Sequence, residues 1–389
     1  MVNVLAFGTY NVRKHPRVGI LIDGLRRNGC TVEEINEPLL LSTAQRVDIL
    51  TRPWKLVGFA WNILGLWRKL RVRSRKWIRA HGNPDVVLVG YMGHFDVLLA
   101  RHLFRHSPIV LDHLIFAADT AKDRGAAGMK VRLLRRLDRM AINAATLVVT
   151  DTREHQDMLR PQDESMVIPV GAPQEWYAAG DLRASAGTSA AAKDEGIVFY
   201  GLYTPLQGTT VIARALCILA QRGMTVKVTM IGQGQDYEKV RRITEKLENV
   251  TFTQWIEPEQ LPSVVARHGI ALGIFSTTPK GLHVVPNKVY QSMAAGCAVV
   301  TSDTAPQRRE LHDGVVYVRP GSPQSLADAL EKLLKDPALL DKARRESRRV
   351  ARDFTAQRVS LPLADWVRNQ TRAHDHDHSQ TTTHTHHNL

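Results

Sequence analysis

"VVPNKVYQSMAAGCAVVTSD", residues 284–303, contains a loop, a short helix, a glycine turn and a buried strand in immediate succession. Pro286 can stiffen the loop, and Asn287 is a favourable N-cap for a helix over 288–295. Gly296 would end that helix. The free N–H groups at the start of the helix, together with its dipole, favour an anion. An ordinary helix of an α/β layer fits the same letters, so this stretch alone leaves both interpretations open.

Strand and helix patterns alternate on both sides of this stretch. Short apolar or β-branched runs, each followed by a helical pattern or a turn, occur at 3–8, 31–35, 84–91, 109–113, 146–150, 197–201, 226–232, 250–255, 270–275 and 298–302. Such alternation predicts parallel sheets with helices on both faces. The fold class is therefore α/β, with two tandem Rossmann-like, doubly wound domains that face each other across a cleft. Ligands of such sheets bind beyond the carboxyl ends of the strands.

The composition of the chain predicts where the domains begin and end. We expect a first domain over 1–172, a small and polar linker over 173–195, and a second domain over 196–354. A further helix over 356–369 is expected to fold back on the first domain. The histidine-rich tail over 370–389 has no apolar anchors, so it is expected to be disordered.

The chain is strongly basic: its 389 residues include 52 Lys and Arg against 38 Asp and Glu, a formal net charge of +14. Such a balance attracts nucleic acid, anionic lipid or phosphorylated substrates. No signal peptide or transmembrane run is evident, because no apolar stretch reaches roughly 20 residues. The three scattered cysteines, Cys30, Cys217 and Cys297, indicate a reducing compartment without disulfides or metal spacing. We therefore expect a cytoplasmic protein.

The segment over 53–79, "PWKLVGFAWNILGLWRKLRVRSRKWIR", combines four tryptophans, an apolar run and dense positive charge. Tryptophan favours the lipid headgroup boundary, and each basic residue near an anionic surface contributes about 1 kcal/mol. We favour a membrane-surface role for this segment. The alternative is an amphipathic helix that packs on the first domain with its charges in water.

Two glycine turns follow strands of the second domain. "FYGLYTPLQG" (199–208) contains Gly201 and Gly208, and "MIGQGQDYEKV" (230–240) contains Gly232 and Gly234. Glycine there allows the backbone to approach a ligand closely. Because glycine ends many strands, each turn alone is a weak signal.

Four stretches together carry a resemblance to a known family: "VIPVGAP" (167–173), "IGQGQDYEKV" (231–240), "VPNKVYQSMAAGCAVVTSD" (285–303) and "RRELHDGVVYVRPGSPQSLADALEKLLKDP" (308–337). In order and spacing they resemble the retaining glycosyltransferases of family four, the "glycosyl transferases group 1", which have the two-domain GT-B fold. The resemblance is strong over 196–337 and looser in the first half. It implies that the second domain binds a nucleotide sugar.

The resemblance assigns roles to residues of the donor loop. Gln291 takes the position where many relatives carry a glutamate that holds the ribose, and His283 takes that of a glutamate contacting the transferred sugar. Val284, Val285, Pro286 and Asn287 complete the substrate-binding loop. A glutamine keeps an acceptor oxygen but loses the charge, and charge-assisted hydrogen bonds are roughly twice as strong as neutral ones.

The family's cations in the first glycine loop are missing here. Leu202 and Gln207 stand where relatives carry the Arg and Lys that hold the diphosphate. Lys280, His283 and Lys288 lie beside the predicted phosphate helix and are our candidates to replace them, although solvated surface charge is the alternative for each.

In the first domain, "VLDHL" (110–114) places Asp112 and His113 at a strand end, where the resemblance puts a histidine near the sugar and phosphate. Relatives place the loop that begins at Gly8 near the donor phosphate and the acceptor. We expect its cations Arg13, Lys14 and Arg17 to meet an acidic acceptor, or to serve solubility alone. Trp255 follows the strand where the family's nucleobase lies, so we expect it to line the base pocket, unless it is core material.

These observations favour a retaining, nucleotide-sugar-dependent glycosyltransferase with a lipid-linked or cell-envelope glycan acceptor at the cytoplasmic membrane face. The expected catalytic residues are Asp112, His113, His283 and Lys288. No metal site or cofactor is expected, since the nucleotide sugar is a substrate and no Asp-x-Asp pair is present. One rival is a sugar-nucleotide-binding or glycan-binding relative without turnover, which Leu202, Gln207 and Gln291 suggest. Nucleic-acid binding ranks last, because no recognition module is evident.

Overall fold

The computed structural model describes residues 2–12, 15–39, 55–90, 93–114, 116–123, 127–185 and 196–383; over 55–57, 122–123 and 372–383 it describes the backbone alone. The chain divides into two compact units. The first unit comprises Met1–Asp151, His155–Ile168 and Gln357–Leu389, and the second comprises Thr152–Glu154 and Pro169–Ala356. Arg13 and Lys14, two of the expected acceptor contacts, lie outside the described residues.

The first unit contains a six-stranded parallel sheet of order β2-β1-β3-β4-β5-β6. Its strands are β1 (Asn3–Gly8), β2 (Thr31–Asn36), β3 (Val86–Val89), β4 (Ile109–Asp112), β5 (Leu147–Thr150) and β6 (Ser165–Val167). Every residue of β3, β4 and β5 is buried, as expected for strands covered by helices on both faces. The chain reverses its direction of sheet growth at β1, which lies between β2 and β3, so the switch point is at the carboxyl end of β1.

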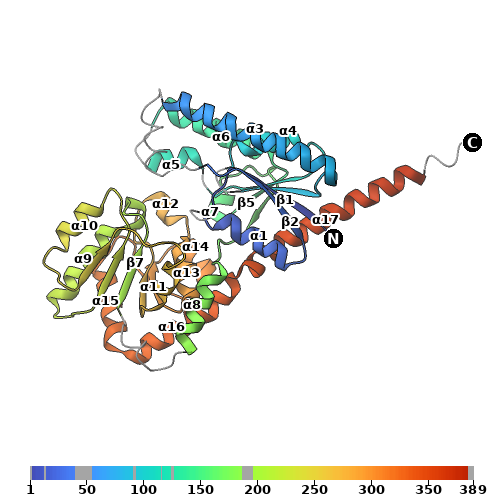
Figure 1. The fold of residues 1–389 in the computed structure, drawn as a ribbon. Helices are drawn as coiled ribbons and strands as arrows, with labels where there is room; N and C mark the ends of the chain where they lie inside the picture. Colours follow the sequence, from blue (N-terminus) through green and yellow to red (C-terminus); the bar gives the residue numbers. More distant parts are fainter. Residues whose placement is uncertain are drawn as a thin grey trace, which may run out of the picture. The chain divides into compact units, whose positions relative to one another are not determined.

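Helices cover both faces of this sheet (Figure 1). They are α1 (Arg17–Arg27), α3 (Lys55–His81), α4 (Asp96–Leu103), α5 (Ala117–Asp123), α6 (Met129–Ala144) and α17 (Ala356–Thr383), with α7 (Arg153–Gln156) at the division between the units. α4 contacts both α3 and α6. The core joins strand and helix residues; for example, the rings of Phe7 and Phe104 pack edge to face with centroids 5.5 Å apart.

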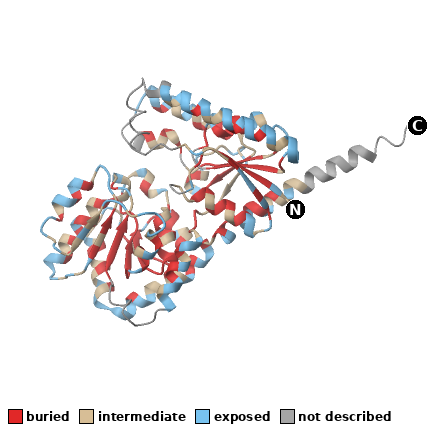
Figure 2. Cartoon of the chain, in the orientation of Figure 1, coloured by how far each residue is buried: buried red, intermediate tan, exposed pale blue. Residues whose placement is uncertain are grey.

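The second unit repeats this architecture with a parallel sheet of order β12-β11-β10-β7-β8-β9. Its strands are β7 (Ile197–Tyr200), β8 (Val228–Ile231), β9 (Val250–Thr253), β10 (Ile270–Leu272), β11 (Ala298–Ser302) and β12 (Val316–Val318). Figure 2 shows these strands as a largely buried layer beneath helices with exposed outer faces. The switch point of this sheet lies between β7 and β10.

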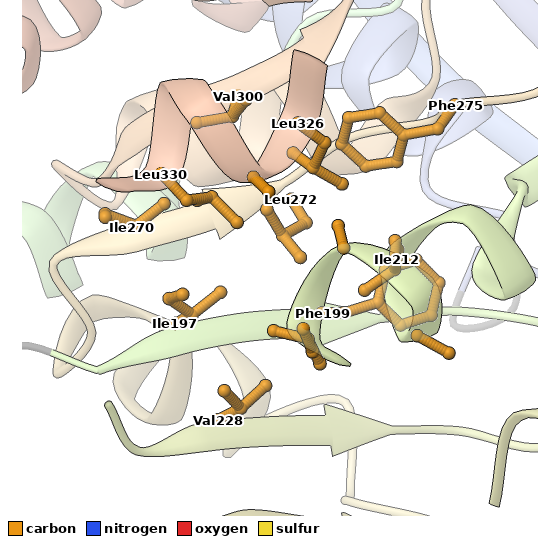
Figure 3. Packing of buried hydrophobic residues seen from close by; sticks show 14 of the residues in the cluster. Ile197, Phe199, Ile212, Val228, Ile270, Leu272, Phe275, Val300, Leu326 and Leu330 are labelled. Carbon is orange, nitrogen blue, oxygen red and sulfur yellow. The ribbon is translucent and has the colours of Figure 1, made fainter. Parts of the chain in front are cut away.

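Helices of the second unit are α8 (Gln174–Ser185), η2 (Pro205–Gln207), α9 (Thr209–Gln221), α10 (Tyr237–Ile243), α11 (Leu261–Ala266), α12 (Pro279–Leu282), α13 (Asn287–Ala294), α14 (Ala305–Leu311), α15 (Pro323–Lys335), α16 (Pro337–Ala351) and η3 (Arg352–Phe354). Figure 3 shows the core they form with the sheet: Leu326 and Leu330 of α15 lie over Ile270, Leu272 and Val300 of the strands. The expected fold class, two doubly wound α/β domains in tandem, is confirmed.

Two expectations about irregular segments are wrong for part of their length. Gln174–Ser185, expected to belong to a linker, forms α8, in which Trp176 is buried and Gly180 packs against the backbone of Ala294. The tail from residue 370 was expected to be disordered, but α17 continues to Thr383. No glycine or proline interrupts residues 370–383, and each residue added to an existing helix costs far less than starting one.

Candidate active site

Two glycine turns meet at the carboxyl edge of the second sheet, where β7 and β8 end. Gly201 and Gly232 both have positive φ, at 139° and 120°. A Cβ on Gly232 would lie 2.0 Å from the carbonyl oxygen of Gly201, and one on Gly234 would lie 2.6 Å from that of Tyr203. The immediate reason for these glycines is therefore that the two turns pack backbone against backbone.

A third glycine connects this edge to the start of α9. Gly208 is left-handed, with φ 67°, and a Cβ there would lie 2.7 Å from the carbonyl carbon of Phe275. The backbone carbonyl of Gln207 accepts a hydrogen bond from the amide of Phe275. The next residue, Thr209, is fully buried, and its hydroxyl has no hydrogen-bond partner among the described residues. The start of α9 thus brings polar groups to the switch point.

Lys288 places a buried ammonium group at the same edge. Its side chain is fully enclosed, and its Nζ lies 3.8 Å from the ring centroid of Phe199 and about 3.0 Å from where a Cβ on Gly201 would be. Among the described residues Nζ has no hydrogen-bond partner. Burial lowers the pKa of Lys288 well below its ordinary value, because the charged form loses its hydration. An anion at this position would restore the stability of the charged form.

The helix that carries Lys288 begins without a capping side chain. α13 starts at Asn287, one residue earlier than expected, and its N-cap is Pro286, so the expectation that Asn287 caps the helix is wrong. The N-cap residue makes no side-chain cap, and the amide of Val289 in the first turn donates to the carbonyl of Pro286. The first-turn amides of a helix, together with its dipole, bind anions. Val285, which precedes Pro286, is buried, and Gln291, one turn after Lys288, is half-buried.

The loop before α13 presents the other donor-loop candidates. α12 is capped by Thr278, whose hydroxyl accepts a hydrogen bond from the amide of Gly281. Lys280 on α12 is partly buried, and His283 directly after it is exposed. The carbonyl of His283 accepts a hydrogen bond from the hydroxyl of Thr152, which fixes the backbone of the loop and leaves the imidazole in solvent. Val284, next along the chain, is partly exposed.

Trp255 and Leu202 are both exposed. The Trp255 ring is 66 % exposed after β9, and its Nε1 donates to Glu257. The expectation that it is core material is therefore wrong. Because β8 and β7 lie between β9 and β10, the structure does not bring Trp255 next to α13. Leu202 is half-exposed and supplies no charge. At the ends of β7 and β8, the cation that the described residues supply is Lys288.

At the switch point of the first unit, a carboxylate closes the first loop. Asp96 accepts hydrogen bonds from the amide and hydroxyl of Thr9, at 2.7 and 2.8 Å, and from Nε1 of Trp67. A Cβ on Gly8 would lie 2.9 Å from Oδ2 of Asp96. Burial raises the pKa of Asp96, and the hydrogen bonds from Thr9 and Trp67 partly offset that rise.

Arg17 and Asp112 form a buried ion pair within the first unit. Nε of Arg17 lies 3.2 Å from Oδ1 of Asp112, and both side chains are almost fully buried. The expectation that Arg17 meets an acidic acceptor from solution is therefore wrong, because its partner is a carboxylate of the same unit. Burial raises the pKa of Asp112 to about 6, although Arg17 acts in the opposite direction.

His113 lies buried among residues that the sequence did not single out. Its ring packs edge to face against His94 and Phe116, with centroids 4.9 and 4.7 Å away. Nε2 of His94 lies 2.9 Å from Oδ1 of Asp138 in α6. The available sequence signal was weak: His94 stands in "GHFD" before a helix, and Asp138 is the only acidic residue of an otherwise basic and apolar helix.

Comparison with known proteins agrees with this architecture. Residues 194–336 match the family model "Glycosyl transferases group 1". Sucrose-phosphate synthase from Thermosynechococcus elongatus has a TM-score of 0.68 at 14 % identity, covering 96 % of this chain and 100 % of the other. Anabaena HepE, solved in complex with UDP-glucose, has a TM-score of 0.63 at 17 % identity, covering 95 % and 100 %.

A third neighbour is a trehalose-phosphate synthase from Burkholderia xenovorans in complex with glucose-6-phosphate, with a TM-score of 0.65 at 12 % identity and 95 % and 99 % coverage. No curated protein sequence matches the chain. At these identities the structural neighbours establish the fold. Taken with the family match over 194–336, they confirm the resemblance at the level of the fold: this chain has the GT-B fold, and its residues 194–336 match the model of the Glycosyl transferases group 1 family.

Proposed function

We propose that this protein is a retaining glycosyltransferase that takes a sugar from a nucleotide-sugar donor. The observation that carries the proposal is the buried ammonium of Lys288, which contacts the Phe199 ring but has no hydrogen-bond partner in the part of the chain that the structure describes. It lies at the start of α13, near the switch point of the second sheet. A leaving diphosphate is the anion that this position would stabilise. The family match and the UDP-glucose bound by HepE support a nucleotide-sugar donor.

In the reaction, the bond between the anomeric carbon and the diphosphate oxygen breaks, and the acceptor oxygen bonds to the same face of the sugar. Negative charge develops on the departing diphosphate, so electrostatic stabilisation is the main task of the protein. The α13 amides and Lys288 supply it without a metal ion. Gln207, Gly208 and Thr209 offer hydrogen bonds at the start of α9.

The donor loop would hold the sugar and ribose. Gln291 accepts a ribose hydroxyl hydrogen bond through its amide oxygen. His283 is exposed, so its imidazole is available to a sugar hydroxyl, and Lys280 is the second cation of the loop. In the first unit, Nε2 of His113 and Oδ2 of Asp112 are buried and have no hydrogen-bond partner among the described residues, so we infer that they are candidates for contact with a substrate.

We further propose that the acceptor is lipid-linked or part of a cell-envelope glycan. Apart from Asn62, the exposed residues of α3 over 58–81 are basic or apolar, and the helix contains no Asp or Glu. Trp61 is 71 % exposed and Leu64 53 % exposed, whereas Trp67 and Trp77 donate hydrogen bonds to Asp96 and Glu33 of the same unit. One face of α3 therefore packs on the first unit, and its other face suits an anionic membrane surface.

α6 adds to the same surface. Its exposed residues are likewise apolar or cationic: Met129, Lys130, Arg132, Leu133, Arg135, Arg136 and Met140. Among the described residues no helix is long and apolar enough to cross a membrane. We therefore propose that the protein binds the cytoplasmic face of the membrane through the exposed residues of α3 and α6.

Transfer assays with UDP-, GDP- and dTDP-sugars test the enzymatic proposal. A retained anomeric configuration in the product and release of the nucleoside diphosphate are expected for one donor. Binding of a donor without turnover for any acceptor would instead support the rival, a sugar-nucleotide-binding protein.

Vesicle co-sedimentation tests the membrane proposal separately. Binding to vesicles that contain anionic lipid should weaken in Trp61→Ala and Arg71→Glu, whereas Arg214→Glu, at an exposed position of α9, should bind as the wild type does. Equal binding to neutral and anionic vesicles would contradict it.

A further inference from the structure

Three residues far apart in sequence bring metal-binding atoms together inside the first unit. His94 lies in the turn before α4, His113 directly follows β4, and Asp138 lies in α6. All three are buried, and one ligand atom from each lies within 4.8 Å of the others. Two imidazoles and one carboxylate form the donor set of many zinc-type sites.

His113 supplies a buried nitrogen that lacks a partner. Its Nε2 has no hydrogen-bond partner among the described residues, although the side chain is only 2 % exposed. An imidazole nitrogen with a free lone pair is the form that binds metal ions.

Asp138 is held in place by two backbone amides. Its Oδ1 accepts a hydrogen bond from the amide of Ala117, at 2.9 Å, and its Oδ2 accepts one from that of Ala118, at 3.1 Å. Backbone groups that orient a carboxylate in this way are typical of the surroundings of metal ligands.

We propose that His94, His113 and Asp138 bind one divalent transition-metal ion of the zinc type, with the fourth position open to water. The 2.9 Å separation of His94 Nε2 and Asp138 Oδ1 allows both to ligate one ion. The ion takes the place of the hydrogen between Nε2 of His94 and Oδ1 of Asp138. The neutral His94 ring then carries its one proton on Nδ1. The ion would connect the start of α4, the end of β4 and α6.

This proposal does not depend on glycosyl transfer. Because Nε2 of His113 can serve one partner at a time, a metal ion and a substrate hydroxyl are alternatives for that atom. A bound metal would therefore make His113 a structural ligand of the first unit.

Metal content of the full-length protein tests the proposal. The protein is treated with chelator, loaded with Zn²⁺ or Co²⁺, and freed of excess metal by gel filtration. The tail contains six further histidines that can bind metal ions, His374, His376, His378, His384, His386 and His387. A variant with all six replaced by Gln, called the tail variant, is therefore compared with wild type and with His113→Gln and His94→Gln.

The tail variant is expected to retain one metal ion per chain, to show the visible absorption of tetrahedral Co²⁺, and to gain thermal stability with Zn²⁺. Combining the tail variant with His113→Gln or His94→Gln should abolish the bound metal ion, the Co²⁺ absorption and the gain in thermal stability. A tail variant that retains no metal overturns the proposal, whether or not the histidine variants fold. Equal retention in the tail variant and in its combination with His113→Gln overturns it as well.

Discussion

The carboxyl edges of the two sheets differ in where their buried charges find partners. In the first unit, Asp96 binds Thr9, and Arg17 pairs with Asp112. In the second unit, Lys288 is equally buried and has no hydrogen-bond partner among the described residues. Both edges belong to six-stranded parallel sheets, although the two sheets differ in strand order.

This difference indicates which edge is completed by a ligand. A buried charge without a partner is costly, and a protein retains it where a ligand supplies the missing charge. The first edge contributes to the stability of its own unit through internal pairs. At the second edge, a negatively charged group such as the diphosphate of the proposed donor would supply the partner for Lys288.

Breaking the internal pair of the first edge should have the largest effect. Asp112→Asn leaves the Arg17 charge buried without its carboxylate, which should lower the free energy of unfolding by about 3–5 kcal/mol in chemical denaturation. Asp23→Asn is the matched control, because it removes the exposed pair with Arg27 on the same α1 helix. That loss should stay below about 0.5 kcal/mol. Equal losses of unfolding free energy in the two variants would show that the buried Arg17–Asp112 pair adds no more stability than an exposed pair.

Removing the unpaired charge of the second edge should reduce activity while leaving stability intact. Lys288→Met keeps the apolar stem, so transfer should fall about 100- to 1,000-fold as the diphosphate loses its cation. The free energy of unfolding should be unchanged or higher, since an uncompensated buried amine is gone. Lys342→Met, in an exposed position of α16, is the control. A strongly destabilised Lys288→Met protein would mean that the lysine is structural.

Crowding the glycine turns tests whether they must pack together. Gly232→Ala brings a Cβ to 2.0 Å from the carbonyl oxygen of Gly201, so it should destabilise the protein by about 3 kcal/mol in thermal unfolding. Gly223→Ala also has positive φ, 73°, but meets nothing within 4 Å. Its cost should be about 1 kcal/mol. If the two variants lose similar amounts of stability, backbone strain at positive φ alone would explain why residue 232 is a glycine.

Restoring a carboxylate near Lys288 should have the smallest effect. Gln291→Glu would form charge-assisted hydrogen bonds with a ribose, so donor affinity measured by calorimetry should rise at most about tenfold. Gln221→Glu, on the exposed end of α9, controls for the change in net charge. If donor affinity falls in Gln291→Glu but not in Gln221→Glu, residue 291 does not contact the ribose.

The sequence predicts strands where continuous apolar runs occur, such as 86–89, 109–112 and 147–150, because these runs have one favourable environment. It misses the three-residue strands β6 and β12, which are mostly only half-buried. It fails at α8, whose small and polar residues show no helical periodicity; the helix is stabilised by contacts of Trp176 and Gly180 that only the fold supplies.

The site was predictable only in part. The position of Lys288 followed from its place after a Pro-Asn pair, but its burial against Phe199 depends on residues far away in the chain. The pairs Arg17–Asp112 and His94–Asp138 join residues 95 and 44 positions apart, so no local spacing reveals them. For the same reason, Arg17 was expected to be a ligand contact although it is part of the core.

Proton uptake on binding of a nucleoside diphosphate tests the central claim most directly. Calorimetric titrations with UDP, GDP and dTDP in buffers of different ionisation enthalpy are compared between wild type and Lys288→Met, at several pH values between neutral and the ordinary lysine pKa. Because burial lowers the pKa of Lys288, an anion beside it should raise that pKa and draw a proton from the buffer. The account predicts uptake in wild type, and weaker binding without uptake in Lys288→Met. Binding of equal strength in both proteins, with no difference in proton uptake, would contradict it.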